Sequence, residues 1–196
     1  MTKSDILQLI KNDPWMMNVI GIAKDLNLPE WVIGAGFVRN KVWNHLHGYT
    51  NKEVDTHDID LVYYDPSGND EKADQELSLR LTKETGINFE VVNQFYAHKW
   101  NGVPPYTSTE DAISTWPETA TAVGVTIKDN RLWLIAPHSV DDLVNIIVRS
   151  SPRFKGNLEA FKRRVKEKCW AEKYPKIRFE GMKNKQNKKR NECAKV

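Results

Sequence analysis

The sequence predicts a mixed α/β (α+β) fold, with a small mixed sheet flanked by helices, a basic C-terminal helix and a flexible tail. Short apolar runs alternate along the chain with stretches of helical spacing, which is typical of a sheet covered by helices. Two strand-like runs on either side of Lys128-Asp129-Asn130 predict a hairpin, which adds antiparallel strands. The length of 196 residues suits one such domain with an appendage.

The individual elements are predicted from the spacing of apolar residues, which differs between helices and strands, and from the turn and cap residues between them. Ser4 suits the N-cap of a first helix, Pro14 occupies the first position of a second, and Ser108 or Thr109 caps a helix that Pro117 ends. Ser139 is expected to cap a later helix. Strands are expected over residues 31–36, 58–64, 87–92, 122–127 and 131–135. Helices are expected over residues 5–11, 14–26, 37–47, 69–85, 93–100, 110–116, 140–148 and 155–169.

Charge divides the chain into two parts. Residues 1–154 hold 14 Lys and Arg against 21 Asp and Glu, whereas residues 155–196 hold 15 against 5. We therefore expect a folded domain over residues 1–154, a basic helical segment over 155–180 packed on it, and a disordered tail over 181–196. The basic segment suits RNA or a phosphorylated ligand, and a solvated tail that aids solubility explains it equally well.

Composition excludes several classes of protein. With 40% hydrophobic and 28% charged residues, the chain is not collagen-like, low-complexity or wholly disordered. No apolar run approaches the ~20 residues of a membrane span, and the first residues lack the apolar block of a signal peptide. We therefore expect a cytoplasmic protein that makes no membrane contact. The absence of Cys-x-x-Cys argues against a structural zinc site.

Two carboxylates at strand spacing carry the strongest chemical signal. Asp58 and Asp60 lie in one expected strand, so their side chains point to one face while Ile59 and Leu61 point to the other. Neighbouring carboxylates repel each other unless a cation lies between them, and Mg²⁺ binds such a pair together with substrate phosphates. An isolated Asp-x-Asp is more often an exposed strand start, although Asp is uncommon in strands.

A second signal is the turn Gly34-Ala35-Gly36, which joins an expected strand to an expected helix. Such a turn brings backbone N–H groups and a helix N-terminus together, which suits a triphosphate, and Arg39 would add a charge-assisted contact. A lone Gly-x-Gly is more often a structural turn. The third glycine of a dinucleotide fingerprint and the Gly-Lys-Ser/Thr of a P-loop are missing, so neither a Rossmann nor a Walker site is indicated.

The Gly34–Gly36 turn followed by the Asp58/Asp60 pair resembles the motif order of the nucleotidyltransferase superfamily that includes DNA polymerase β. Within it, residues 34–40 and the Asp-Ile-Asp-Leu run resemble the Gly-Gly-x-Val-Arg-Asp and Asp-x-Asp motifs of CCA-adding enzyme and bacterial poly(A) polymerase head domains. Nearly the whole chain, including residues 105–112 and 116–125, also resembles a bacterial family of small nucleotidyltransferase-like proteins. The fold that this resemblance implies is a nucleotidyltransferase core.

The resemblance also implies roles for individual residues. Asp58 and Asp60 would hold Mg²⁺, and Glu90 would be the third catalytic carboxylate, although an exposed strand position also explains it. Asn93 would contact the nucleotide sugar or cap the helix that follows. The residues expected to bind the nucleotide triphosphate are Gly34, Ala35, Gly36 and Arg39.

The chain departs from the CCA-adding pattern. Ala35 replaces the second glycine, Asn40 replaces the acid after the arginine, and the base-reading Glu-Asp-x-x-Arg motif is missing. The leading prediction is a Mg²⁺-dependent enzyme that moves a nucleoside monophosphate from an NTP to a hydroxyl of RNA, protein or a small molecule. The alternative is a catalytically inactive nucleotide- or RNA-binding module of the same fold. Oligomeric state does not follow from the sequence.

Other residues keep two interpretations each. Trp116 and Trp133 would stack on a nucleobase or anchor a core or partner interface. His57 is a phosphate or metal contact or an ordinary loop residue. The helix that carries Arg163 and Arg164 is too basic to be buried on every face, and would follow an RNA backbone.

Overall fold

The computed structural model describes residues 1–49, 58–68, 70–154, 156 and 158–181. Its helices in this part of the chain are α1 (Lys3–Lys11), α2 (Pro14–Asp25), α3 (Gly36–His47), α4 (Glu71–Thr85), α5 (Gln94–Asn101), α6 (Thr109–Ile113), α7 (Asp141–Val144), α8 (Leu158–Glu167) and α9 (Trp170–Lys173). The strands are β1 (Val32–Gly34), β2 (Ile59–Tyr63), β3 (Phe89–Asn93), β4 (Gly124–Lys128), β5 (Arg131–Ile135), β6 (Ile147–Val148) and β7 (Arg178–Phe179).

Five of the strands form one mixed sheet in the order β3-β2-β1-β4-β5. β2 and β3 are parallel, and the other neighbouring pairs are antiparallel. Asp129 and Asn130 connect β4 to β5 with φ angles of 49° and 58°, the left-handed conformation that two-residue hairpins favour. The predicted mixed α/β fold and the hairpin are confirmed. β6 and β7 form a separate parallel pair beside the sheet.

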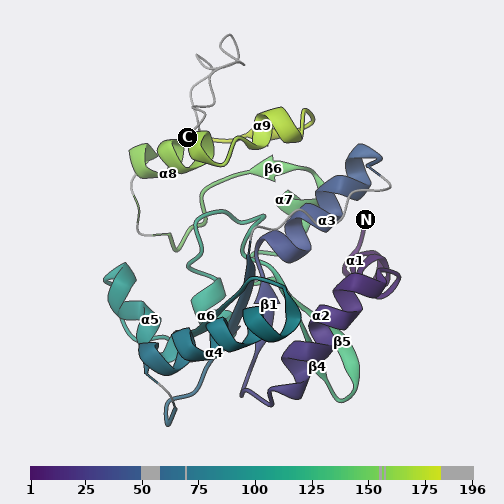
Figure 1. Ribbon diagram of the computed structural model, residues 1–196. Coiled ribbons are helices and arrows are strands. Elements are labelled where there is room, and N and C mark those ends of the chain that lie inside the picture. Colours follow the sequence, from purple (N-terminus) through teal and green to yellow (C-terminus); the bar gives the residue numbers. More distant parts are fainter. Residues whose placement is uncertain (50–57, 69, 155, 157, 182–196) are drawn as a thin grey trace.

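The main apolar core lies on one face of the sheet. Ile33, Leu61 and Val125 point to this face and pack with the apolar sides of α1, α2, α3 and α4. Figure 1 shows these helices along the sheet, with α8 and α9 together at one end of the molecule beyond β6 and α7. This face is closed, because helices cover it along its length.

The opposite face carries a smaller apolar cluster and the acidic residues. Val32 and Val62 point to this face and pack with Ile113 of α6. Side chains alternate along a strand, so Asp60 of β2 shares this face with Val62. Strand alternation therefore places the core residues and the carboxylates of β2 on opposite sides of the same sheet.

Helix α4 covers the outer edge of β3, which is an edge strand of the sheet. Alternate N–H groups of the strand donate to helix side chains at four-residue intervals: Phe89 to Thr82 (3.2 Å), Val91 to Ser78 (2.9 Å) and Asn93 to Asp74 (2.6 Å). Four helical residues rise about 6 Å and two strand residues about 6.6 Å, so the two spacings match. The edge is thereby protected against pairing with another strand.

Several predictions about the ends of helices were wrong. Val140, not Ser139, is the N-cap of α7, and the helix that Pro117 was expected to end already ends at Ile113. Thr2, not Ser4, caps α1, because Thr2 and Asp5 form a reciprocal capping box. The helix expected over residues 140–148 ends at Val144, because Ile146 adopts a φ of 56° and the next residues pair with β7. The helix expected over residues 155–169 begins at Leu158 and is followed by a separate short helix.

Parts of the other predictions fall outside the described residues. These are the role of His57 and almost all of the tail that was expected to be disordered. Within the described part of the chain, every helix is too short or too polar to cross a membrane.

Candidate active site

The turn between β1 and α3 leads directly into the N-terminus of a helix. Ala35 precedes α3 with a φ of 50°, and α3 lacks a side-chain cap at its N-terminus. A Cβ atom on Gly34 would lie 2.5 Å from Cη2 of Trp116 and 3.2 Å from the carbonyl oxygen of Val123, so only glycine fits there. The first N–H groups of a 12-residue helix are therefore left without a side-chain acceptor, beside a closely packed turn.

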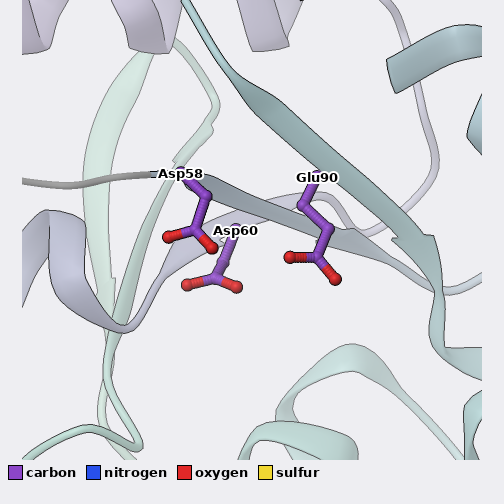
Figure 2. A group of neighbouring side chains, drawn as sticks. All are labelled: Asp58, Asp60 and Glu90. Carbon is purple, nitrogen blue, oxygen red and sulfur yellow. The ribbon is translucent and has the colours of Figure 1, made fainter. Parts of the chain in front are cut away.

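Three carboxylates converge beside this turn. Asp60 of β2 and Glu90 of β3 are paired residues in the parallel register, and Asp58 directly precedes β2. One carboxylate oxygen from each of the three residues lies within 4.8 Å of the others. Figure 2 shows the three side chains extending in the same direction from two neighbouring strands. The structure thus brings together the three acidic residues that the sequence analysis had singled out.

The electrostatics of this cluster favour a bound cation. Burial, followed by the charges of Asp58 and Glu90, raises the pKa of Asp60 from 3.8 to about 7, although Arg39 and Lys168 act in the opposite direction. The cluster therefore tends to keep a proton near neutral pH when no cation is present. Three carboxylates form the all-oxygen donor set that hard divalent ions such as Mg²⁺ prefer.

A cavity of about 340 Å³ opens beside the Asp residues of this cluster. Ala35, Asp58 and Asp60 line one side of it. Its other side is cationic, and is formed by Arg164 and Lys168 in and just after α8 and by Lys173 of α9. The arrangement places positive charge across a small space from the carboxylates, as a polyanionic ligand with a bound cation requires.

Arg39 supplies a further positive charge inside this cavity. Its guanidinium donates to Oδ1 of Asn40 (3.2 and 2.9 Å) and to Oγ1 of Thr121 (2.8 Å), and lies 4.6 Å from the ring centre of Trp170. Burial lowers the pKa of Arg39 to about 10, so it stays protonated at neutral pH. These hydrogen-bond partners are neutral. They therefore orient the guanidinium, and the negative charge on which it acts comes from nearby carboxylates, Glu118 first.

A buried ion pair fixes the basic helix over the cavity. Glu118 is fully buried, and its Oε1 accepts a 2.6 Å hydrogen bond from Nε of Arg164 in α8. A buried carboxylate needs such a partner, because desolvation without one is costly. The pair ties α8 to the loop before β4. That loop also supplies the carbonyl group of Val123, which accepts a hydrogen bond from the N–H of Ala35 in the turn between β1 and α3.

A second cavity, of about 520 Å³, lies between α4, β3 and α5. Glu90 lines this second cavity, Asp60 lines the first, and Asp58 lines both. The carboxylate cluster therefore stands at the junction of two cavities of different charge. The sequence could not reveal this junction, because it depends on how α4 and α8 pack at opposite sides of the cluster.

Two residues that the sequence singled out lie elsewhere. Asn93 is fully buried; it caps α5 through Phe95 and exchanges hydrogen bonds with the backbone of Asp65. It lines neither cavity, so of its two interpretations the cap is confirmed. Trp133 is 55% exposed on β5 and also lines neither cavity, whereas Trp116 lines the first.

Sequence reasoning missed Thr121 and Glu118 as parts of the site. Thr121 orients Arg39, and Glu118 anchors α8. Both residues lie in the stretch 116–125, which contributed to the family resemblance, but no local pattern marks them. Their roles arise from contacts with residues 82 and 46 positions away in the chain.

Comparisons with known proteins agree with this geometry. A family profile described as nucleotidyltransferase matches residues 21–179. A solved structure described as revealing a CCA-adding enzyme head domain is 32% identical, with a TM-score of 0.80 over 92% of this chain and 97% of that one. No similar protein was found among curated sequences.

Structures of CCA-adding enzymes share the fold at lower identity. The Thermotoga maritima CCA-adding enzyme complexed with tRNA is 18% identical, with a TM-score of 0.55 over 93% of this chain and 43% of that one. A CCA-adding enzyme with CTP is 17% identical, with a TM-score of 0.53 over 92% and 43%. This chain spans less than half the length of these enzymes. The match over residues 21–179 and the head-domain relative show that the chain belongs to this nucleotidyltransferase family.

Proposed function

We propose that this chain is a Mg²⁺-dependent nucleotidyltransferase, which moves a nucleoside monophosphate from an NTP to an acceptor hydroxyl and releases pyrophosphate. The observation that carries the proposal is the carboxylate cluster at the edge of a cavity whose other wall is cationic. Family membership supports it. So do the structures of CCA-adding enzymes with CTP and with ATP, which share this fold.

The NTP triphosphate is assigned to the first cavity. The uncapped N-terminus of α3 and the turn at Gly34, Ala35 and Gly36 offer backbone N–H groups to phosphate oxygens. Arg39 and Lys168 add positive charge from two sides. Asp58 and Asp60 line the same cavity, so an NTP bound here lies next to the carboxylates. A cation between them would offset the repulsion between the carboxylates and the phosphate oxygens.

The carboxylates fit a divalent cation, and we assign Mg²⁺ to Asp58 and Asp60, with Glu90 toward the acceptor. When bound, the ion would offset the charge on the phosphate and promote ionisation of the acceptor hydroxyl. The acceptor oxygen forms a bond to the α-phosphorus, and the bond from that phosphorus to the bridging oxygen breaks. Pyrophosphate leaves with the electron pair, and the hydroxyl proton passes to solvent or to Glu90.

We assign different roles to the basic residues that line the cavity and to those that are exposed on α8. Arg164 and Lys168 line the NTP cavity, so we assign them to the nucleotide phosphates. Arg163 and Lys166 are exposed on α8 and are the residues that would contact RNA. The reaction is placed in the cytoplasm, as the sequence predicts.

A nucleotide-binding module without catalytic activity is the competing proposal. Asn40, which stands where related head domains have an acid, motivates it. Asn40 keeps the hydrogen bonds to Arg39 while leaving the guanidinium charge in the cavity, which favours triphosphate binding under either proposal. The two proposals therefore differ in turnover and not in nucleotide affinity.

The test uses each α-labelled NTP with Mg²⁺ and a cell extract that contains RNA, protein and small molecules. Wild type is compared with the double variant Asp58→Asn/Asp60→Asn and with Asp129→Asn, an exposed hairpin aspartate outside both cavities. Transfer of label by wild type and Asp129→Asn, but not by the double variant, supports the enzyme. NTP binding without any transfer supports the binding module. Equal transfer by all three proteins would remove the carboxylates from the proposal.

A further inference from the structure

We propose that the acceptor is a small organic molecule with a hydroxyl group and a neutral or positive charge, bound in the second cavity between α4, β3 and α5. This inference rests on the proposed function, because an acceptor is used only if a nucleotide is transferred. It narrows three acceptor classes, namely RNA, protein and small molecules, to one.

The position of the carboxylates assigns one substrate to each cavity. Asp60 lines the first cavity, Glu90 lines the second, and Asp58 lines both. A triphosphate needs the cationic wall, which only the first cavity has among the described residues that line the two. A molecule in the second cavity would reach the same carboxylate cluster from the other side, as an attacking hydroxyl must.

The charge of the second cavity disfavours a polyanion. Its described lining includes Glu71 and Asp74 besides Asp58 and Glu90, and contains no Lys or Arg. Asp74 is buried and already accepts hydrogen bonds from the hydroxyls of Tyr63 and Tyr96 and from a backbone N–H group. Glu71 and Glu90 are exposed. An RNA backbone would meet these carboxylates with no counter-charge, whereas a neutral or cationic molecule would not be repelled.

The size and lining of the cavity suit a small molecule. Its volume of about 520 Å³ lies within the range of about 300–1,000 Å³ that is usual for small-ligand sites. Leu79 and Trp100 line it and are 72% and 57% exposed, so two large apolar side chains face solvent. The indole Nε1 of Trp100 donates to Oε1 of Glu71 (3.0 Å), which holds the ring at the cavity. A ring held in this way can stack on the flat or apolar face of a ligand.

The first experiment separates acceptors before the reaction. A cell extract is divided into total RNA, total protein, anionic small molecules and small molecules that do not bind an anion exchanger. Each fraction is incubated with wild-type protein, Mg²⁺ and α-labelled NTPs. We expect label to move only in the fraction of non-anionic small molecules. Label on RNA, protein or anionic small molecules alone overturns the inference but leaves the proposed function intact. Label in no fraction overturns both.

A pair of tryptophan variants tests the place of binding. Trp100→Ala removes a lining residue of the second cavity, and Trp133→Ala removes an equally exposed tryptophan outside both cavities. With the active fraction as the acceptor, we expect kcat/KM for Trp100→Ala to fall about tenfold or more through KM. The Kd for the NTP, measured by calorimetry, should stay within about twofold. Equal kcat/KM for the two variants, with both folded, would remove the acceptor from this cavity.

A variant that adds a positive charge tests the same cavity without relying on stacking. Gln75 lines the second cavity on α4, and Gln75→Lys would place a positive charge there. We expect this variant to use a cationic acceptor less well than wild type, by about threefold to tenfold, and to use it better at high salt. Gln75→Glu is the matched control and should not weaken use of the acceptor. If Gln75→Lys instead improves transfer, the acceptor is anionic and the inference fails.

Discussion

The two sides of β2 have opposite chemistry although they share one strand. Ile59, Leu61 and Tyr63 are at most 1% exposed and pack into the helical core. Asp60 lies between them in the sequence and points to the other side, where Asp58 and Glu90 join it. One side is closed by helices, and the other opens on two cavities.

The difference shows that stability and chemistry are separated across the thickness of a single sheet. The buried side gains free energy from apolar contact, whereas three carboxylates at close distance lose free energy through repulsion and desolvation. The free energy gained by apolar packing on one side of the sheet therefore offsets the cost of holding the carboxylates together on the other. Changes on the two sides should accordingly have different effects, and four predictions test this.

The largest expected effect is on catalysis and comes from the acidic side. Asp60→Asn removes one negative charge and one metal-binding oxygen, and we expect kcat to fall about 1,000-fold or more. The melting temperature of the metal-free protein should not fall. The check is a single-turnover transfer assay beside thermal unfolding. A large loss of activity together with a lower melting temperature would mean that the carboxylate also supports the fold.

The next effect is on stability and comes from the core side, one residue away. Leu61→Ala removes a fully buried side chain, and we expect it to lower the free energy of unfolding by about 2–5 kcal/mol. The remaining folded protein should keep its affinity for NTP, because Leu61 lines neither cavity. Urea unfolding and calorimetry measure the two quantities. A change of less than about 1 kcal/mol would contradict the described packing.

The third effect is a pH dependence that only the acidic side confers. The pKa of Asp60 is raised from 3.8 to about 7, so the folded protein binds the proton more tightly than the unfolded chain. The contribution of this group to stability is full below pH 3.8 and is lost as the pH rises through about 7. Asp60→Asn removes the effect.

We therefore expect metal-free Asp60→Asn to be more stable than wild type at pH 8, by about 1–3 kcal/mol, and the two to converge near pH 4. Added Mg²⁺ should narrow the difference at pH 8, because it stabilises the wild-type carboxylates. Denaturant unfolding at several pH values measures this, with Asp129→Asn as the control that should follow wild type. A constant difference between Asp60→Asn and wild type across this range would argue against a raised pKa at Asp60.

The smallest effect concerns the turn that approaches the acidic side. Ala35 has a φ of 50°, a conformation that a side chain disfavours and glycine adopts freely. Ala35→Gly should raise the free energy of unfolding by about 0.5–1 kcal/mol without loss of NTP affinity. Ala73→Gly, in the first turn of α4, is the control and should lower it, because glycine is unfavourable in a helix. If both variants destabilise equally, the turn carries no strain.

Much of the fold and part of the site followed from local sequence patterns. The alternation in β2 was enough to place Asp58 and Asp60 on one side of a strand, and the turn residues marked the start of α3. Helix ends were less predictable, since Ile146 takes a left-handed conformation only because the following residues pair with β7. Asn93 had two interpretations that local patterns could not separate, and its burial decided for the cap.

The sequence by itself determined which side chains share a face, where the Gly34–Gly36 turn lies, and which family the chain resembles. These features depend on residues close together in the chain. Only the tertiary structure decided that Glu90 joins the two aspartates, because that contact depends on the parallel register of β2 and β3. It also decided that Arg164 covers the cavity through Glu118, and that two cavities of different charge meet at Asp58. These contacts join segments tens of residues apart, and packing, not local periodicity, selects them.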